Sequence, residues 1–307
     1  MKRIIYSKIN TQIIPSSKEA AFLLGVSESE LLKLVMEADT LYHEIHLQKK
    51  DGGVRTINAP KEKLKDIQRR VLFNLLVKAE LPLCVYGFGS GKSIIENAEA
   101  HKKNEYMFNL DIKDFFPSVH YKKILQLFKE LGCSEQTAKV LCKLVTLKYC
   151  LPQGAPTSPY LSSLALNHLD LRLFSLAKLN RLTYTRYFDD VTFSGSKRIL
   201  DIKDTAMSII TSEGYEVKKT KIKSYGPTDE KEITGIIIKT DGSLDVKGLD
   251  DFFLYLKELR KFGISRLRSA LVEKERQSIL GKIAFTYSVN PRNGKFLSTI
   301  FKDIKWI

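Results

Sequence analysis

Two apolar stretches of this chain carry carboxylates where buried strands are expected. Residues 106–112 (YMFNLDI) predict a strand that holds Asp111, and residues 183–194 predict a strand, a turn at Asp189 and Asp190, and a second strand. Buried carboxylates repel each other unless a cation lies between them. The chain must therefore bring cations to these aspartates, unless YFDD is merely an acidic hairpin turn.

The ligand chemistry of the three aspartates indicates which ion they would hold. Oxygen ligands without His or Cys favour a hard cation such as Mg²⁺. Two such ions about 3.5–4 Å apart are the usual device for phosphoryl transfer to a hydroxyl, one activating the hydroxyl and the other stabilising the triphosphate and its leaving pyrophosphate. The aspartates therefore point to nucleotidyl transfer.

A third unusual string lies between the aspartates. In LPQGAPTSP, at 151–159, Gly154 permits a close backbone approach to a substrate, and Ser158-Pro159 predicts the start of a helix. An ordinary Pro/Gly loop is the alternative for this string alone. Its place, about 40 residues after Asp111 and about 30 before YFDD, favours one catalytic arrangement over three coincidences.

The charge of the chain suggests a polyanionic partner. Fifty Lys and Arg stand against 35 Asp and Glu, a formal charge of +15. Nucleic acid is the first partner to consider, and a highly soluble basic enzyme is the alternative. Residues 251–307 hold 12 Lys or Arg and 5 Asp or Glu, a net +7. Their period predicts helices, the first with Phe252, Phe253, Leu256 and Leu259 on its apolar face and Gly263 at its end, which leaves the basic face open.

Other patterns complete the expected elements. Two short helices are predicted over 17–36, with Gly25 between them and Ser27 and Glu30 as a capping box; this resembles a helix-turn-helix, although simple packing is the alternative. A hairpin is expected around 51–53, helices over 61–79, 121–131 and 134–148, and one strand over 233–238.

The four cysteines lack metal-ligand spacing and are expected to be reduced. Without a leader-like N-terminus or an apolar run of about 18 residues, a cytoplasmic protein and no membrane partner are expected.

With these motifs in this order, the chain resembles the reverse transcriptases, and within them the retron reverse transcriptases of bacteria. NLDIKDFFPS resembles the family's first catalytic strand, LPQGAPTSP its template- and nucleotide-positioning loop, and YTRYFDD its second catalytic turn, with Phe188 where retron enzymes usually have Ala. Asn97-Ala98-Glu99-Ala100-His101 matches the retron NAxxH element, and Ile233-Thr234-Gly235 matches their VTG. A structural histidine is the alternative for His101.

The resemblance implies roles for particular residues. Asp111, Asp189 and Asp190 would be catalytic and, with Ile112, metal-binding, and Lys221 would protonate pyrophosphate, although Lys219 and Lys223 leave that assignment open. Phe116 would exclude a ribose 2′-OH, or else is a core residue. The other implied nucleotide-binding residues are Lys49, Arg55, Gln153 and Gly154. The implied RNA-binding residues are Asn97, His101, Lys257, Arg260, Lys261, Arg266 and Arg268.

The fold that the resemblance implies is α+β, a right hand with N-terminal helices and fingers over 1–105, an antiparallel-sheet palm over 106–248 and a basic helical thumb over 249–307. The enzyme would use two Mg²⁺ ions, or Mn²⁺ in their place, and dNTPs. It would copy part of a structured noncoding RNA into short DNA joined to a guanosine 2′-OH of that RNA. Because retrons are phage-defence systems, a separate effector protein is also implied.

Three other functions remain open from the sequence. A group II intron or diversity-generating reverse transcriptase would share the palm, but the former normally carries extensions for which 307 residues leave no room. An abortive-infection polymerase would work without a template. A non-catalytic DNA-binding regulator would use the helices of 17–36 but has no need of three aspartates.

Overall fold

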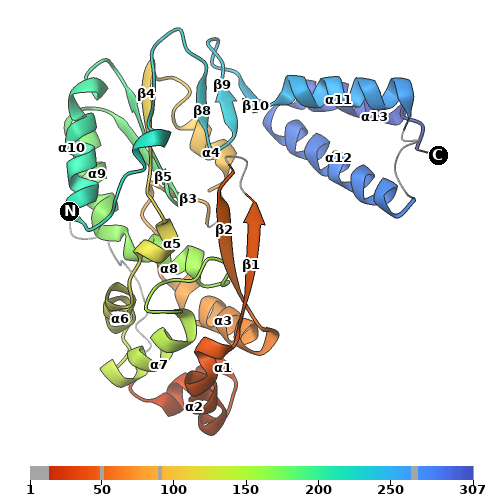
Figure 1. The fold of residues 1–307 in the computed structure, drawn as a ribbon. Helices are drawn as coiled ribbons and strands as arrows, with labels where there is room; N and C mark the ends of the chain where they lie inside the picture. Colours follow the sequence, from red (N-terminus) through yellow and green to blue (C-terminus); the bar gives the residue numbers. More distant parts are fainter. Residues whose placement is uncertain (1–13, 49–51, 89–91, 264–268, 307) are drawn as a thin grey trace.

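The computed structural model describes residues 14–48, 52–88, 92–263 and 269–306 (Figure 1). Helices and strands are mixed along the chain, in the α+β class that the sequence predicts. Three expected site residues, Lys49, Arg266 and Arg268, lie outside the described residues. Within the described part, no helix is both long and apolar enough to cross a membrane.

A five-stranded sheet forms the centre of the structure. Its order is β3 (Val85–Tyr86), β5 (Thr183–Tyr187), β6 (Asp190–Gly195), β4 (Tyr106–Asp111) and β7 (Lys223–Tyr225). All neighbours are antiparallel except β3 and β5. The strand expected around 106–112 and the strand–turn–strand expected over 183–194 are both confirmed.

The two faces of this sheet pack against different layers. Phe108 and Leu110 of β4 join Val191 and Phe193 of β6 in the main core, which α9 (Asn167–Leu179) and α10 (Ile199–Ser212) help to cover. Met107, one residue out of phase, packs instead with α4 (Ile94–Glu99) and the small sheet of β8 (Lys231–Ile233), β9 (Ile236–Ile238) and β10 (Leu244–Val246). Successive side chains of a strand point to opposite faces, so this alternation fixes the face on which each later residue lies.

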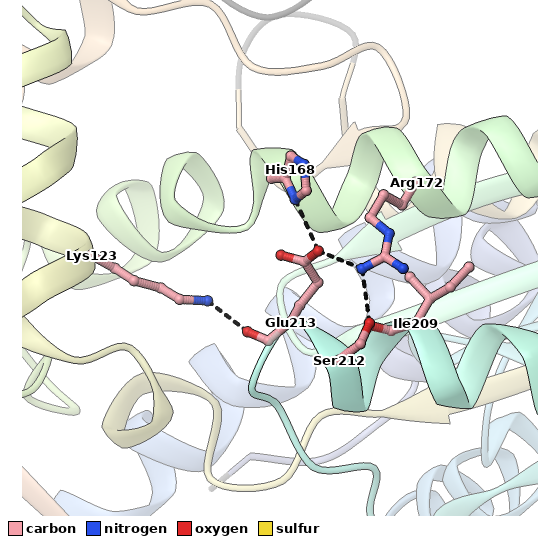
Figure 2. Close-up of polar contacts among 6 residues, drawn as sticks. All are labelled: Lys123, His168, Arg172, Ile209, Ser212 and Glu213. Carbon is pink, nitrogen blue, oxygen red and sulfur yellow. Dashed lines mark hydrogen bonds and ion pairs between the residues drawn. The ribbon is translucent and has the colours of Figure 1, made fainter.

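Ionic contacts fasten the carboxyl end of α10 to its neighbours (Figure 2). Glu213 follows α10, and its carboxylate accepts from Arg172 of α9 at 2.7 Å and contacts His168 at 2.9 Å. Lys123 of α6 (Tyr121–Glu130) donates to the Glu213 carbonyl at 2.9 Å. Basic groups suit the negative end of a helix dipole, so this cluster holds together the helices behind the sheet.

The N-terminal helices are confirmed as α1 (Ser17–Leu24) and α2 (Glu28–Glu37), followed by the short 3₁₀ helix η1 (Ala38–Thr40). Gly25 ends α1 in a left-handed conformation, and the Ser27 hydroxyl accepts from the Glu30 amide. Leu24, Leu31 and Leu34 are buried against α3 (Glu62–Asn74) and α7 (Glu135–Val145). The apolar faces of the pair are thus used in packing, the simpler of its two interpretations.

The expected hairpin consists of β1 (Tyr42–Gln48) and β2 (Val54–Pro60), with Tyr42 opposite Pro60. Two expected helices are shorter than predicted. The one expected over 61–79 ends at Asn74, because Leu75 leaves helical geometry, and continues as the 3₁₀ helix η2 (Leu76–Lys78). The one expected over 134–148 ends at Val145, because Thr146 is extended.

The expected strand over 233–238 is wrong. Two strands stand there, β8 (Lys231–Ile233) and β9 (Ile236–Ile238), and β10 (Leu244–Val246) pairs with β9. Thr234 and Gly235 have φ values of 48° and 86°, which make a two-residue turn between β8 and β9. Positive φ at both central residues is the geometry that joins tight hairpins, and an apolar run of this kind conceals it.

Three C-terminal helices form a separate unit that projects from the rest (Figure 1): α11 (Leu249–Phe262), α12 (Ser269–Val289) and α13 (Pro291–Lys302). They have their own core around Leu256, Ile279 and Leu297. Gly263 ends α11, as predicted. The main core, in contrast, is continuous from Ile14 to Val217 and crosses the boundary expected at residue 105.

Candidate active site

Asp111 and Asp190 lie side by side at one end of the central sheet. Asp111 ends β4, Asp190 begins β6, and their Cα atoms are register partners in the antiparallel pairing. Because Phe108, Leu110 and Val191 point toward α9 and α10, both aspartates point to the opposite face. Asp189 belongs to the two-residue turn that joins β5 to β6. The fold therefore brings the three predicted aspartates together.

Backbone hydrogen bonds hold the end of the sheet where Asp111, Asp189 and Asp190 lie, which we call the aspartate corner. The Ile112 amide donates to the Asp189 carbonyl at 3.0 Å, and the Lys218 amide donates to the Asp111 carbonyl at 2.8 Å. The Ile112 side chain is buried and carries no ligand atom, so only its carbonyl oxygen could serve an ion. These bonds link β4 both to the turn of Phe188 and Asp189 and to the segment before β7.

The electrostatics of the corner are those of crowded carboxylates. Burial, followed by the charges of Asp189 and Asp111, raises the pKa of Asp190 to about 7. Burial and then the charge of Asp111 also raise the pKa of Asp189. Such shifts mean that the site favours protons or other cations over bare negative charge. The charges of Lys221 and then Arg55 of β2 act in the opposite direction on the pKa of Asp189.

Lys221 is the lysine that reaches the aspartates. It lies in the 3₁₀ helix η3 (Lys219–Lys221), and its Nζ donates to Asp111 Oδ2 at 2.5 Å. Partial burial lowers the pKa of Lys221, but the bond to Asp111 outweighs it and the net shift is upward. Lys223, a rival for the same role, is bonded to Glu232 at 2.7 Å. The geometry thus favours Lys221 over Lys223, one of the two rivals, with Lys219, that the sequence left open.

The donor atoms at this corner suit a hard divalent ion, because they are carboxylate oxygens in a site whose pKa values favour added positive charge. Across the described ranges, however, no three His, Cys, Asp or Glu side chains stand at the spacing of a complete metal cage. One of the oxygens, Asp111 Oδ2, is bonded to Lys221. The residues therefore fit an ion in chemistry, with side chains that would adjust around it.

Phe188, which stands where retron enzymes usually have Ala, lies in the turn between β5 and β6 with a φ of 53°. Its ring packs edge-on against Phe88 at 5.1 Å and against Tyr187 at 4.8 Å between ring centres. A Cβ at Gly87 would come within 3.2 Å of that ring. The larger side chain is therefore accommodated by an aromatic cluster, away from the aspartates.

The loop before α8 (Ser158–Ala165) contacts the β1–β2 hairpin. The Gln153 carbonyl accepts from the Asn58 amide at 2.7 Å, and a Cβ at Gly154 would lie 2.7 Å from Ile57 Cγ2. A close approach to the backbone of Gly154 therefore exists, as predicted. The approaching group in this structure is β2, whereas a substrate was expected. This contact joins the hairpin that carries Arg55 to the predicted nucleotide loop.

Phe116 lies in the short helix α5 (Phe115–Ser118), which follows β4 and the left-handed Asp114. Its ring is half-buried and meets Phe115 edge-on, with 5.3 Å between ring centres. It packs at the margin of the main core, whereas Phe115 is buried within it. A half-exposed ring so close to Asp111 in sequence is compatible with both interpretations of this residue.

Asn97 and His101 do not form the RNA-contacting surface that the sequence suggested. Their residues are 1% and 0% exposed. The His101 ring bonds to Ser194 Oγ at 2.5 Å and to Thr185 Oγ1 at 2.8 Å, and burial lowers its pKa to about 3. Direct RNA contact is therefore corrected to a structural role: His101 ties β5 to β6. The apolar residues beside this motif in the sequence were the signal from which its burial could have been predicted.

The cations of α11 lie on the open face, as predicted. Lys257, Arg260 and Lys261 are exposed. Lys257 stands over the Phe253 ring at 4.2 Å, Lys261 stands over Phe262 at 5.0 Å, and Arg260 pairs with Asp303 at 3.7 Å. Exposed pairs of this kind are weak, so these charges remain available to a polyanion.

Sequence reasoning missed a buried ion pair behind the turn. Arg186 of β5 and Asp170 of α9 have fully buried side chains that are 2.6 Å apart. The available signal was a charged residue in each of two apolar elements, because an unpaired charge would be costly there.

Comparisons with known proteins agree with this geometry. The family model described as reverse transcriptase (RNA-dependent DNA polymerase) matches residues 47–238, well over half of the chain. Two telomerase structures share the fold: that of Candida albicans in complex with a fragment of telomeric RNA has a TM-score of 0.52 and 12% identity over 80% of this chain and 56% of its own. Apo telomerase of Candida tropicalis has a TM-score of 0.50, 10% identity, and 85% and 60% coverage. The fold is thus that of right-hand polymerases.

Curated relatives narrow the class. The retron Ec86 reverse transcriptase of Escherichia coli is 36% identical over 70% of this chain and 69% of its own length. The retron Mx65 enzyme of Myxococcus xanthus is 31% identical over 92% and 70%, and the Mx162 enzyme of the same organism is 32% identical over 75% and 54%. This chain therefore belongs to the family of retron reverse transcriptases. It is an RNA-directed DNA polymerase, and an RNA template is the partner that its family implies.

Proposed function

We propose that this enzyme copies part of a structured noncoding RNA into a short DNA that remains joined to that RNA through a guanosine 2′-OH, as part of an anti-phage retron. The observation that carries the proposal is the similarity to retron enzymes, which extends over 92% of the chain in one case. The three aspartates at one end of the sheet support the same proposal.

The residues of this chain have separable roles in the proposed reaction. Asp111, Asp189 and Asp190 would hold two Mg²⁺ ions, for which Mn²⁺ is a substitute, and these ions supply Lewis-acid stabilisation of the attacking and leaving oxygens. Arg55 would bind the triphosphate as a planar fork. Lys221, which already reaches Asp111, would carry the proton for pyrophosphate. Phe116 would exclude a 2′-OH, and Gln153 and Gly154 would line the nucleotide.

The fingers, palm and thumb are proposed over 1–105, 106–248 and 249–307. The separate core of α11–α13 supports the last boundary. The exposed Lys257, Arg260 and Lys261 make that unit the candidate surface for the RNA. A separate effector protein and a cytoplasmic location belong to the same proposal. The aspartate corner argues against a non-catalytic DNA-binding regulator, since regulation does not require three clustered aspartates.

Isolation of the bound nucleic acid tests this proposal. The protein is expressed with its neighbouring genomic sequence and purified, with Asp189→Asn as the inactive control. RNase should leave a short DNA carrying a small ribonucleotide remnant, which a debranching enzyme releases with a free 5′ end. DNA that is free, random in sequence or attached to a protein side chain would contradict the proposal and favour a template-independent polymerase.

A further inference from the structure

The catalytic turn contains a backbone conformation that requires support. Tyr187 and Asp190 pair across the turn, and Phe188 between them has a φ of 53°. A bulky residue rarely adopts this left-handed conformation, and it persists only where the surroundings hold it. The carbonyl of Phe188 belongs to the peptide unit that leads into Asp189, so its direction helps to set the direction of that carboxylate.

Arg186 supplies this support from inside the protein. Its Nη1 donates to the Phe188 carbonyl at 2.9 Å, and its Nη2 donates to the Ser163 carbonyl at 3.2 Å. The side chain is fully buried. Since the Asp189 carbonyl accepts from the Ile112 amide, the peptide groups on both sides of Asp189 are held.

Asp170 fixes the guanidinium in turn. Its two carboxylate oxygens accept from Nε at 2.7 Å and from Nη2 at 2.6 Å, and the Tyr184 hydroxyl donates to the same carboxylate at 2.7 Å. A forked pair of this kind sets the plane of the guanidinium as well as its position. Buried ion pairs are often no more stabilising than apolar replacements, so stability alone is a weak reason for this one.

We infer that Arg186, fixed by Asp170, is a positioning residue of the polymerase: it holds the Phe188 carbonyl and thereby aims Asp189 and Asp190 at the reacting phosphate. It touches neither nucleotide nor metal in this role. Lysine keeps the charge opposite Asp170 but has a single nitrogen, which cannot grip Asp170, Ser163 and Phe188 in the same plane. Arg186→Lys therefore removes the directed hydrogen bonds of the guanidinium and keeps the positive charge opposite Asp170.

The control is Arg172→Lys. Arg172 of α9 also pairs with a carboxylate, that of Glu213 just after α10, and its Nη1 donates to Glu213 and Ser212 (Figure 2). If the role of Arg186 were purely structural, the two variants would have the same activity per folded molecule. A positioning role makes them differ in kcat and in the divalent-ion concentration that gives half-maximal activity.

The experiment measures dNTP incorporation on a primed RNA template, per folded molecule, across a series of Mg²⁺ concentrations. For Arg186→Lys we expect kcat to fall about 10- to 100-fold and the half-maximal Mg²⁺ concentration to rise several-fold, with the KM for dNTP nearly unchanged. Arg172→Lys should leave all three values near wild type. Unchanged kcat and Mg²⁺ dependence in folded Arg186→Lys would overturn the inference.

If Arg186→Lys does not fold, Asp170→Asn replaces it, because asparagine keeps the size of the side chain and weakens the fork. The same loss of kcat and the same Mg²⁺ shift are then expected, and their absence would overturn the inference equally. The template is an ordinary primed RNA, so a failure of the proposal about branched DNA would leave this result unaffected.

Discussion

Asp111 and Asp190 are register partners on adjacent antiparallel strands and project from the same face of the sheet. The relationship depends on strand register, since a slip of one residue would turn one of the carboxylates into the core beside Leu110 or Val191. The Ile112 amide on the Asp189 carbonyl helps to hold this register, and the bonds of His101 to Thr185 and Ser194 fix β6 in turn against β5.

The buried His101 should make stability depend on pH. Its pKa is about 3 in the folded protein and about 6.5 when unfolded, so the unfolded state binds more protons as the pH falls through this window. Stability is then fully present above pH 6.5 and is lost toward pH 3. Between pH 7 and pH 5, His101 should account for a loss of about 2 kcal/mol in urea unfolding. His101→Gln should lack this loss, and the exposed His43→Gln should retain it; equal slopes in all three proteins would refute the assignment.

Gly154→Ala should disturb the contact between the loop and the hairpin. The new Cβ would lie 2.7 Å from Ile57 Cγ2 and 3.0 Å from the Asn58 carbonyl, at a φ of 124°. We expect a loss of about 1–3 kcal/mol in the free energy of unfolding and a lower kcat. Ile57→Ala in the same protein should restore part of the stability. Gly281→Ala in α12 meets nothing within 4 Å and should be neutral or stabilising by up to about 1 kcal/mol, so equal effects at both glycines would contradict the steric explanation.

Phe116→Ala should admit ribonucleotides. If the ring blocks a 2′-OH, its removal relieves a clash, and the ratio of kcat/KM for rNTP to that for dNTP should rise by about tenfold or more. Single-nucleotide incorporation gives both values. Phe115→Leu, at the buried neighbouring ring, serves as the control and should leave the ratio unchanged. An unchanged ratio in Phe116→Ala would mean that Phe116 is a core residue and does not select the sugar.

Neutralising Lys257, Arg260 and Lys261 together should flatten the salt dependence of RNA binding. Each phosphate contact that is lost lowers the slope of log K against log salt by about 0.7–0.9. The exposed Lys33, Lys129 and Lys139 lie on α2, α6 and α7, away from α11, and neutralising them is the matched control. A slope that is the same in both triple variants would place the RNA elsewhere.

The sequence predicts the fold and the aspartate corner well because both depend on local patterns. Apolar alternation marked β4 and β6, and the turn was visible in YFDD. The turn at Thr234 and Gly235 escaped prediction, since its backbone geometry lies within an uninterrupted apolar run. The role of Arg186 also escaped prediction, and for His101 a structural role was one of two alternatives, because their partners lie 16 to 93 residues away in sequence. Such long-range pairing has no local signature.

The measurement that bears most directly on the three aspartates is incorporation of labelled dNTP on a primed RNA template. Asp189→Asn and Asp190→Asn should each lower incorporation by about a thousandfold or more, with folding and RNA affinity preserved, and chelation of divalent ions should do the same to the wild type. The exposed Asp204→Asn should behave as wild type. Near-normal incorporation by either active-site variant would contradict the assignment of this corner as the polymerase active site.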